Sequence, residues 1–174
     1  EAAVEAMEYM RSEVRKAGFP DMHYMMMDGG GFPFNERNKA SVDNRMFLKP
    51  DSWALYNMGG FDPDSMRHGQ NAIDYRNGWD SYMDIPVFPT VSIGWDDTPR
   101  FPAKGENDVT RFNHSPEAFK NFLKEAKRYA DEHPEQPKFV MINAWNEWVE
   151  GSYLLPDRYW GYGWLEAVKE VFGP

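Results

Sequence analysis

Apolar residues recur at helical spacing in four segments of the chain. In residues 2–16 they stand every three or four positions with charged residues between them, and Gly18 and Pro20 follow as a stop signal. A second start signal is Ser115-Pro116-Glu117, where a capping Ser precedes a Pro and an acid in the first turn. The pattern predicts helices over residues 2–16, 71–83, 115–132 and 164–172.

Between these segments stand apolar runs of the length of buried strands. They cover residues 23–27, 53–58, 86–93 and 139–144. Most are followed by glycine or polar residues, which indicates strands that end in loops. Pro86 and Pro89 interrupt the third run, so we expect that strand to be the least regular, because proline cannot donate to a ladder.

Strands separated by helices predict a parallel sheet with right-handed crossovers. Four such units are half of a (β/α)8 barrel of the TIM type, and we expect residues 1–174 to form the C-terminal four βα units of such a catalytic domain. An open doubly wound sheet is the alternative, and it also binds ligands where strands end. Against it, Gly29-Gly30-Gly31 is followed by Phe32-Pro33-Phe34, which does not open a helix as a phosphate-binding loop requires.

Composition narrows the classes of function. With 41% hydrophobic and 16% aromatic residues in 174, the chain has enough apolar material for a core. A net charge of −9 without a basic stripe argues against nucleic acid as a partner and disfavours polyanionic substrates. The absence of cysteine excludes disulfides, thiolate nucleophiles and cysteine-based zinc sites. No apolar run approaches the roughly 20 residues of a membrane helix, so we expect no membrane partner.

The strongest chemical signal is the segment from Trp145 to Gly151, which contains Glu147 and Glu150 and follows the apolar run 139–142. Acid/base work on a glycosidic bond needs two carboxyl groups whose surroundings separate their pKa values. Tryptophan beside them suits sugars, because the indole face stacks on the apolar C–H face of a pyranose ring. The alternative is a loop whose acids are solvated and whose tryptophans are core. The clustered arrangement favours the sugar site.

Two motifs resemble one family. The stretch from Asn143 to Leu154, with the later Tyr162-Gly163-Trp164-Leu165-Glu166-Ala167-Val168, is similar to the C-terminal part of glycoside hydrolase family 99-like proteins, some of which carry the label WbsX-type glycosyltransferase. The segment Gly94-Trp95-Asp96-Asp97-Thr98-Pro99-Arg100 resembles a second motif of that group. The resemblance covers roughly the second half of the chain in detail and the first half only in general pattern.

The resemblance implies a (β/α)8 barrel that acts on α-linked glycans with retention. In it, Glu147 would take a proton from the 2-hydroxyl group, whose oxygen attacks the anomeric carbon to form a 1,2-anhydro sugar. Glu150 would protonate the leaving oxygen and later activate water. General acid/base catalysis of this kind needs no protein nucleophile. Val149 stands where the mannosidases of the family have a His, and this departure puts their exact substrate contacts in doubt for this chain.

Further residues are weaker binding candidates. Asp96 and Arg100 could hold sugar hydroxyls, or could form an ion pair that staples their loop. Trp95 and Trp145 could be stacking platforms or packing at the end of the sheet. The predicted substrate-binding set is Asp28, Trp95, Asp96, Arg100, Trp145, Asn146 and Trp148. We expect no metal and no cofactor, because His68 and His114 lack metal-ligand spacing and Asp62-Pro63-Asp64 offers too few oxygens for calcium.

The sequence therefore predicts a glycoside hydrolase whose partner is a carbohydrate substrate. Two other functions stay open: a carbohydrate-binding fragment without catalysis, and a glycosyltransferase of polysaccharide biosynthesis. Four units cannot close a barrel, so we expect the N-terminal half to come from the same protein or from another chain. The chain opens at Glu1 without an initiator Met, which is compatible with an address sequence upstream, and degradation of polysaccharide favours a periplasmic or secreted location.

Overall fold

A computed structural model of the chain describes residues 2–28, 46–56, 83–96, 98–101, 111–112 and 115–174. Its helices are α1 (Ala2–Lys16), α4 (Pro116–Glu132) and α5 (Gly163–Phe172), with the short 3-10 helix η1 (Trp148–Glu150). These bounds confirm three of the four predicted helices to within one residue. The fourth, predicted over 71–83, lies outside the described residues except for Met83, which is buried. None of the described helices is long and apolar enough to cross a membrane.

The start of α4 follows its predicted capping signal. The Ser115 hydroxyl accepts a hydrogen bond from the Ala118 N–H at 3.1 Å, and Pro116 opens the helix where no N–H is needed. The helix then buries one face. Its buried residues are Ala118, Phe119, Leu123, Ala126, Tyr129 and Ala130.

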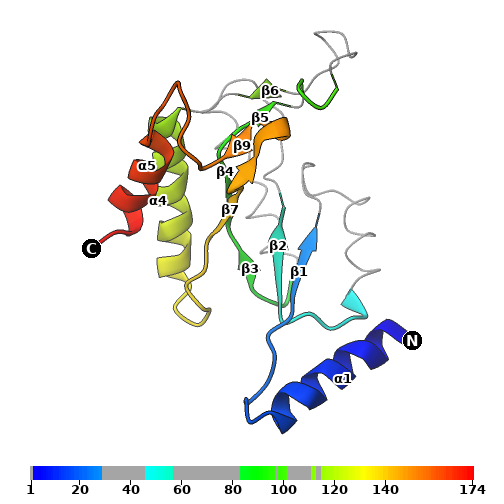
Figure 1. The fold of residues 1–174 in the computed structure, drawn as a ribbon. Coiled ribbons are helices and arrows are strands. Elements are labelled where there is room, and N and C mark those ends of the chain that lie inside the picture. The colour runs from blue at the N-terminus through cyan, green and yellow to red at the C-terminus, as the bar shows by residue number, and fades with distance from the viewer. Residues whose placement is uncertain (1, 29–45, 57–82, 97, 102–110, 113–114) are drawn as a thin grey trace.

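Five described strands run parallel, and their pairing follows the order of the sequence (Figure 1). They are β1 (Met25–Asp28), β2 (Ser52–Leu55), β3 (Val87–Phe88), β4 (Thr90–Ser92) and β7 (Met141–Asn143). β2 pairs with β1 and with β3, whereas β4 pairs with β7. β3 and β4 are separated by Pro89 alone, whose carbonyl accepts a hydrogen bond from the Met141 N–H at 2.9 Å. They are therefore one strand that is interrupted where proline lacks a donor.

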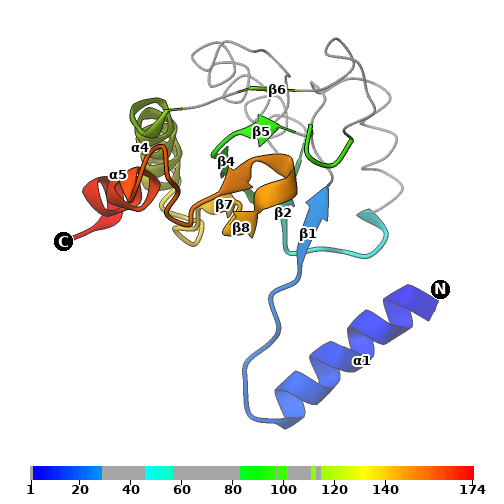
Figure 2. The same ribbon diagram turned by 45° about the horizontal axis from the view of Figure 1, so that its top comes forward.

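Two short antiparallel pairs lie beyond the carboxyl ends of the parallel strands (Figures 1 and 2). One joins β5 (Trp95–Asp96) to β6 (Arg111–Phe112), and the other joins β8 (Asn146–Glu147) to β9 (Ser152–Tyr153). The sequence did not predict either pair, because two-residue strands leave no periodic pattern. They place the two motif-bearing segments at the same end of the sheet.

The main core lies between the interrupted strand and the two C-terminal helices. Phe119 and Leu123 of α4 are fully buried, and the Phe119 ring meets the Trp164 ring edge-on at 5.7 Å. Val91 and Ile93 fill the sheet side of the same cluster. A second, smaller cluster surrounds Trp53 of β2.

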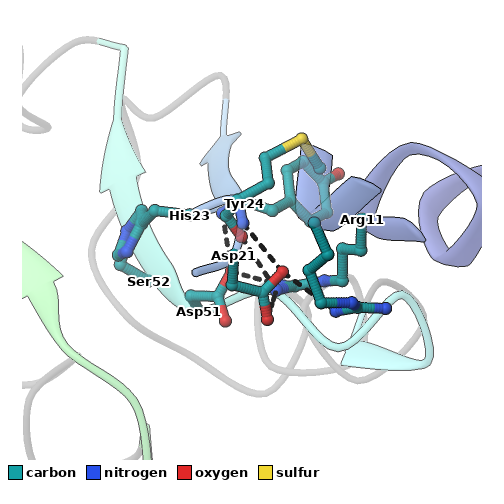
Figure 3. Close-up of polar contacts among 8 residues, drawn as sticks. Arg11, Asp21, His23, Tyr24, Asp51 and Ser52 are labelled. Atoms are coloured by element: carbon teal, nitrogen blue, oxygen red, sulfur yellow. Dashed lines mark hydrogen bonds and ion pairs between the residues drawn. The ribbon is translucent and has the colours of Figure 1, made fainter. Parts of the chain in front are cut away.

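Helix α1 is held differently, at the end where β1 and β2 begin (Figures 1 and 3). None of its residues is buried. The Arg11 guanidinium donates to the Asp51 carboxylate at 2.5 Å and to the Met22 carbonyl at 2.8 Å, and it lies 3.2 Å from the Asp21 carboxylate. The Asp51 carboxylate also accepts the Tyr24 N–H at 2.6 Å. Arg11 thus connects the helix to the segments that enter both strands, and we call these contacts the Arg11 clamp.

Candidate functional site

The segment with both candidate acids forms a tight hairpin directly after β7. In it β8 runs antiparallel to β9, with Asn146 opposite Tyr153 and Glu147 opposite Ser152, and η1 makes the turn. Gly151 closes the turn with φ 62°, a left-handed conformation that favours glycine, and its N–H donates to the Trp148 carbonyl at 3.2 Å. The sequence motif therefore ends in glycine for a conformational reason.

Buried polar contacts fix this hairpin to the end of β7. The Ser152 hydroxyl lies 2.8 Å from the Asn143 carbonyl and 2.5 Å from the Asn143 side-chain oxygen. The Leu154 N–H reaches the Ala144 and Trp145 carbonyls, both at 3.0 Å. The Asn143 amide nitrogen is buried without a hydrogen-bond partner among the described residues. Both Asn143 and Ser152 are positioning residues that the sequence analysis did not single out.

Glu150 is the buried member of the acid pair. It is 5% exposed, and its carboxylate forms a charged hydrogen bond with the Arg100 guanidinium, whose side chain is half exposed. An opposite charge in contact favours the ionised form of a carboxyl group. Arg100 is thus in an ion pair with a candidate acid, a partner that the sequence interpretation did not name.

Glu147 has a different environment at the other end of η1. It is partly exposed, and among the described residues it forms no ion pair. Asp96 lies close to the same turn, because a side-chain carbon built on Gly151 would meet the Asp96 backbone nitrogen at 3.0 Å. Its carboxylate accepts hydrogen bonds from the Thr98 N–H at 2.9 Å and from the Thr98 hydroxyl. The two motif segments are thus in contact.

The predicted aromatic candidates have unequal environments. Trp145 is 56% exposed and Trp148 is 46% exposed, whereas Trp95 is half-buried in β5. The Trp148 ring stacks on the Tyr153 ring, with centroids 4.0 Å apart and planes inclined by 27°. Asn146 is exposed in β8. Asp28 ends β1 opposite Leu55, at the same end of the sheet as the hairpin.

Beyond the hairpin, Asp157 organises the loop that leads to α5. Partial burial acts to raise the pKa of Asp157, but hydrogen bonds from the backbone N–H groups of Trp160 and Tyr159, and from the Trp164 and Tyr153 side chains, lower it below its usual value. Desolvation, with the neighbouring Asp157 charge, raises the pKa of the Tyr153 hydroxyl. This network was not predicted from the sequence, because its contacts are made by backbone N–H groups and by side chains of separate elements.

No group of three or more His, Asp or Glu side chains within the described ranges is arranged to hold a metal ion. An apolar groove of about 400 Å³ lies away from the hairpin, between the ends of α4 and α5 and the segment that enters β7. Its lining includes Ala130, Phe139, Ile142, Val168 and Phe172, and none of the candidate site residues belongs to it.

Carboxylates beside exposed aromatic rings, at the carboxyl ends of parallel strands, are typical of proteins that handle carbohydrate. Comparison with known families agrees with this class. The model of the family described as "Glycosyltransferase WbsX" matches residues 1–168, so the chain belongs to this carbohydrate-active family. The family resemblance expected from the two motifs is confirmed.

Curated relatives extend far beyond this chain. The protein is 36% identical over 89 residues to "Uncharacterized protein WxcX" from Xanthomonas campestris pv. campestris strain B100, and equally to the protein of that name from strain ATCC 33913. The alignment covers 51% of this chain and 12% of the relative's length in each case. No solved structure matches the chain.

Proposed function

We propose that this chain contributes the acid pair of an enzyme that cleaves α-linked glycans, with Glu147 and Glu150 in the two roles. The observation that carries the proposal is the hairpin, which holds one buried and one accessible carboxyl group three positions apart beside exposed tryptophans. Membership of a carbohydrate-active family supports the substrate class. One carboxyl group can act as the acid and the other as the base only if their surroundings differ.

In the first step we assign the proton transfers as follows. Glu147 takes the proton of the sugar's 2-hydroxyl group, and that oxygen bonds to the anomeric carbon as the glycosidic bond breaks. The leaving oxygen receives a proton from Glu150. In the second step Glu150 takes a proton from water, whose oxygen bonds to the anomeric carbon. The carbon–oxygen bond of the anhydro ring opens, and Glu147 returns its proton to the 2-oxygen.

Arg100 sets a condition on this cycle. While the guanidinium contacts Glu150, it occupies a carboxylate oxygen that would otherwise face the leaving group. We therefore propose that Arg100 leaves Glu150 when substrate binds and donates to sugar hydroxyls instead. Its half-exposed side chain has room for this movement, and a planar guanidinium suits paired hydroxyl acceptors.

We also propose the barrel as the setting of this site. Parallel strands that neighbour one another in sequence order, with the described candidate residues at or beyond their carboxyl ends, support half of a (β/α)8 barrel. A doubly wound sheet reverses its strand order at the ligand crevice, and the described strands contain no such reversal. The remaining units would come from the same protein or from another chain.

The second candidate is glycosyl transfer, which the family's printed description favours. The same first step would serve it, with a sugar hydroxyl in place of water in the second. We expect hydrolysis to dominate, because no phosphate-binding glycine loop stands between a strand and a helix in the sequence. Product analysis with and without sugar-nucleotide donors separates the two.

The test is an activity assay of the full-length protein on a panel of α-linked polysaccharides. Glu147→Gln and Glu150→Gln should each reduce kcat by about 10²–10⁴-fold and leave binding intact. Arg100→Gln should raise KM, because the substrate then loses the guanidinium donors that we assign to its hydroxyl groups. Full activity in either Gln variant would refute the acid pair. A wild type that binds glycan but shows no turnover would favour a binding protein.

A further inference from the structure

The loop between β9 and α5 displays aromatic rings that the proposed reaction does not use. Tyr159 is 82% exposed, Tyr162 65% and Trp160 39%. Exposed aromatic surface is costly in water, and a contiguous patch of it commonly marks a binding surface. The loop lies at the same end of the sheet as the acid-bearing hairpin (Figure 1).

The backbone under these rings is rigidly built. Asp157 and Gly161 exchange two backbone hydrogen bonds, at 3.2 and 3.1 Å, and Gly161 adopts φ 58°. The Asp157 carboxylate accepts the Tyr159 N–H at 2.7 Å and the Trp160 N–H at 2.5 Å. Its other oxygen accepts the Trp164 indole N–H at 3.3 Å, which connects the loop to the buried face of α5. Little backbone entropy therefore remains to be lost when a ligand binds.

The rings themselves are arranged as a corner. Tyr159 and Trp160 meet edge-to-face, with centroids 4.6 Å apart and planes at 87°, and Trp160 meets Trp164 at 6.2 Å and 68°. Trp160 is thereby braced by a buried ring, while the Tyr159 ring faces solvent. Two perpendicular rings fit a folded or bent chain of pyranose units, whose C–H faces stack on one ring while hydroxyls reach the other.

This corner is joined to the acid pair by a continuous set of contacts. The Tyr153 hydroxyl donates to Asp157, and the Tyr153 ring stacks on Trp148, which stands between Glu147 and Glu150. A polymer that occupies the active hairpin therefore has an aromatic path toward the loop. The side chains around the corner favour sugar over a protein partner, because three of the exposed residues of the loop are aromatic and none is Leu, Ile, Val or Met.

We propose that Tyr159 and Trp160 form a second glycan subsite, which holds a sugar unit distant from the bond that is cleaved. The inference rests on the glycan class of the proposed function and makes the substrate a polymer rather than a single terminal sugar. It does not depend on hydrolysis. Neutral chains fit best, because Asp157 and Arg158 leave the loop without net formal charge in a protein of net charge −9.

Affinity electrophoresis of the full-length protein tests the subsite. Native gels would contain dextran, pullulan or α-mannan, with polygalacturonate as the anionic comparison. We expect at least one neutral polysaccharide to retard the wild type, and Tyr159→Ala to weaken that affinity about tenfold. Tyr159→Phe keeps the aromatic ring and should retain most of the affinity of the wild type. Tyr9→Ala removes a 65% exposed tyrosine from α1 and is the matched control, expected to bind as the wild type does.

The outcomes separate the subsite from the acid chemistry. Glu147→Gln and Glu150→Gln should lose turnover and keep retardation. A wild type that is retarded but hydrolyses nothing refutes the proposed hydrolase and leaves the subsite standing. Retardation of Tyr159→Ala equal to that of the wild type overturns the subsite, as does a wild type that no neutral gel retards. Because Tyr159 is so exposed, its removal leaves the fold intact, which circular dichroism verifies.

Discussion

Helices α1 and α4 carry similar amphipathic patterns but are held by different forces. α4 buries six residues against α5 and the sheet, whereas α1 buries none and is fixed by the Arg11 clamp. Periodicity shows which face of a helix can be buried, and not whether another element covers it. The difference divides the described structure into an apolar C-terminal region, which supports the candidate site, and a polar attachment at the opposite end of the sheet.

The largest expected effect comes from the apolar region. Phe119→Ala should lower the free energy of unfolding by about 3–5 kcal/mol, because it leaves a cavity against Trp164 in the main core. Urea denaturation monitored by tryptophan fluorescence measures it. Met10→Ala on α1 is the control, with an expected change within about 0.5 kcal/mol because that side chain is 42% exposed. Equal losses in the two variants would remove the distinction between the regions.

A smaller, local effect should follow from breaking the Arg11 clamp. The hydrogen bond with Asp51 raises the pKa of Arg11, and the Arg11 side chain is 13% exposed, so its contacts are partly shielded from solvent. Arg11→Gln should lower the free energy of unfolding by about 1–2 kcal/mol. This figure is kept small because the Asp51 side chain is 35% exposed and solvent weakens the pair. We expect the amides of α1 to lose protection in hydrogen exchange while those of α4 keep theirs.

Arg15→Gln supplies the control for that experiment. Within the described ranges the Arg15 guanidinium pairs with Asp21 at 3.1 Å, with nearly half of each side chain exposed, and such a pair contributes little. Protection of α1 should therefore stay close to that of the wild type. If Arg11→Gln also leaves protection unchanged, α1 is held by contacts other than the clamp.

Local signals in the sequence predicted the elements well. The bounds of α1 and α4 and the cap at Ser115 follow from spacing and capping chemistry, and the interruption of the third strand follows from Pro89. Strand ends were less accurate: the predicted 53–58 is observed as Ser52–Leu55, and 139–144 as Met141–Asn143. Strand ends depend on partners that periodicity does not identify.

Contacts between distant segments could not be predicted in this way. Arg11 meets Asp51 and Arg100 meets Glu150 across 40 and 50 positions, and no local pattern pairs a given charge with a given partner at such distances. The motifs indicated which segments carry the chemistry, and the contact of Gly151 with Asp96 agrees with their grouping. The roles of Glu147 and Glu150 remain predictions, as does the closure of the barrel.

The smallest expected effect on stability is the pH dependence that arises from two exposed aspartates, one in each region. Hydrogen bonds from Lys127 and Lys138 lower the pKa of Asp131 from 3.8 to about 2. The pKa of Asp21 is lowered chiefly by the Met22 backbone N–H, with Arg11 and Arg15 adding to it. Since both pKa values lie below those of the unfolded chain, each contact stabilises the fold above about pH 4 and is lost as pH falls through the folded pKa.

Salt should separate these two aspartates in an NMR titration of their carboxyl groups. The charge partners of Asp131 are exposed lysines, so about 0.5 M NaCl should clearly raise the midpoint of its titration. Lys138→Gln should raise the same midpoint, because it removes the contact between α4 and the segment that enters β7. The midpoint of Asp21 should move less, because a backbone hydrogen bond at 2.8 Å is not screened as an ion pair is. An Asp131 midpoint near 3.8 in the wild type at low salt would show that these lysine contacts do not persist in solution.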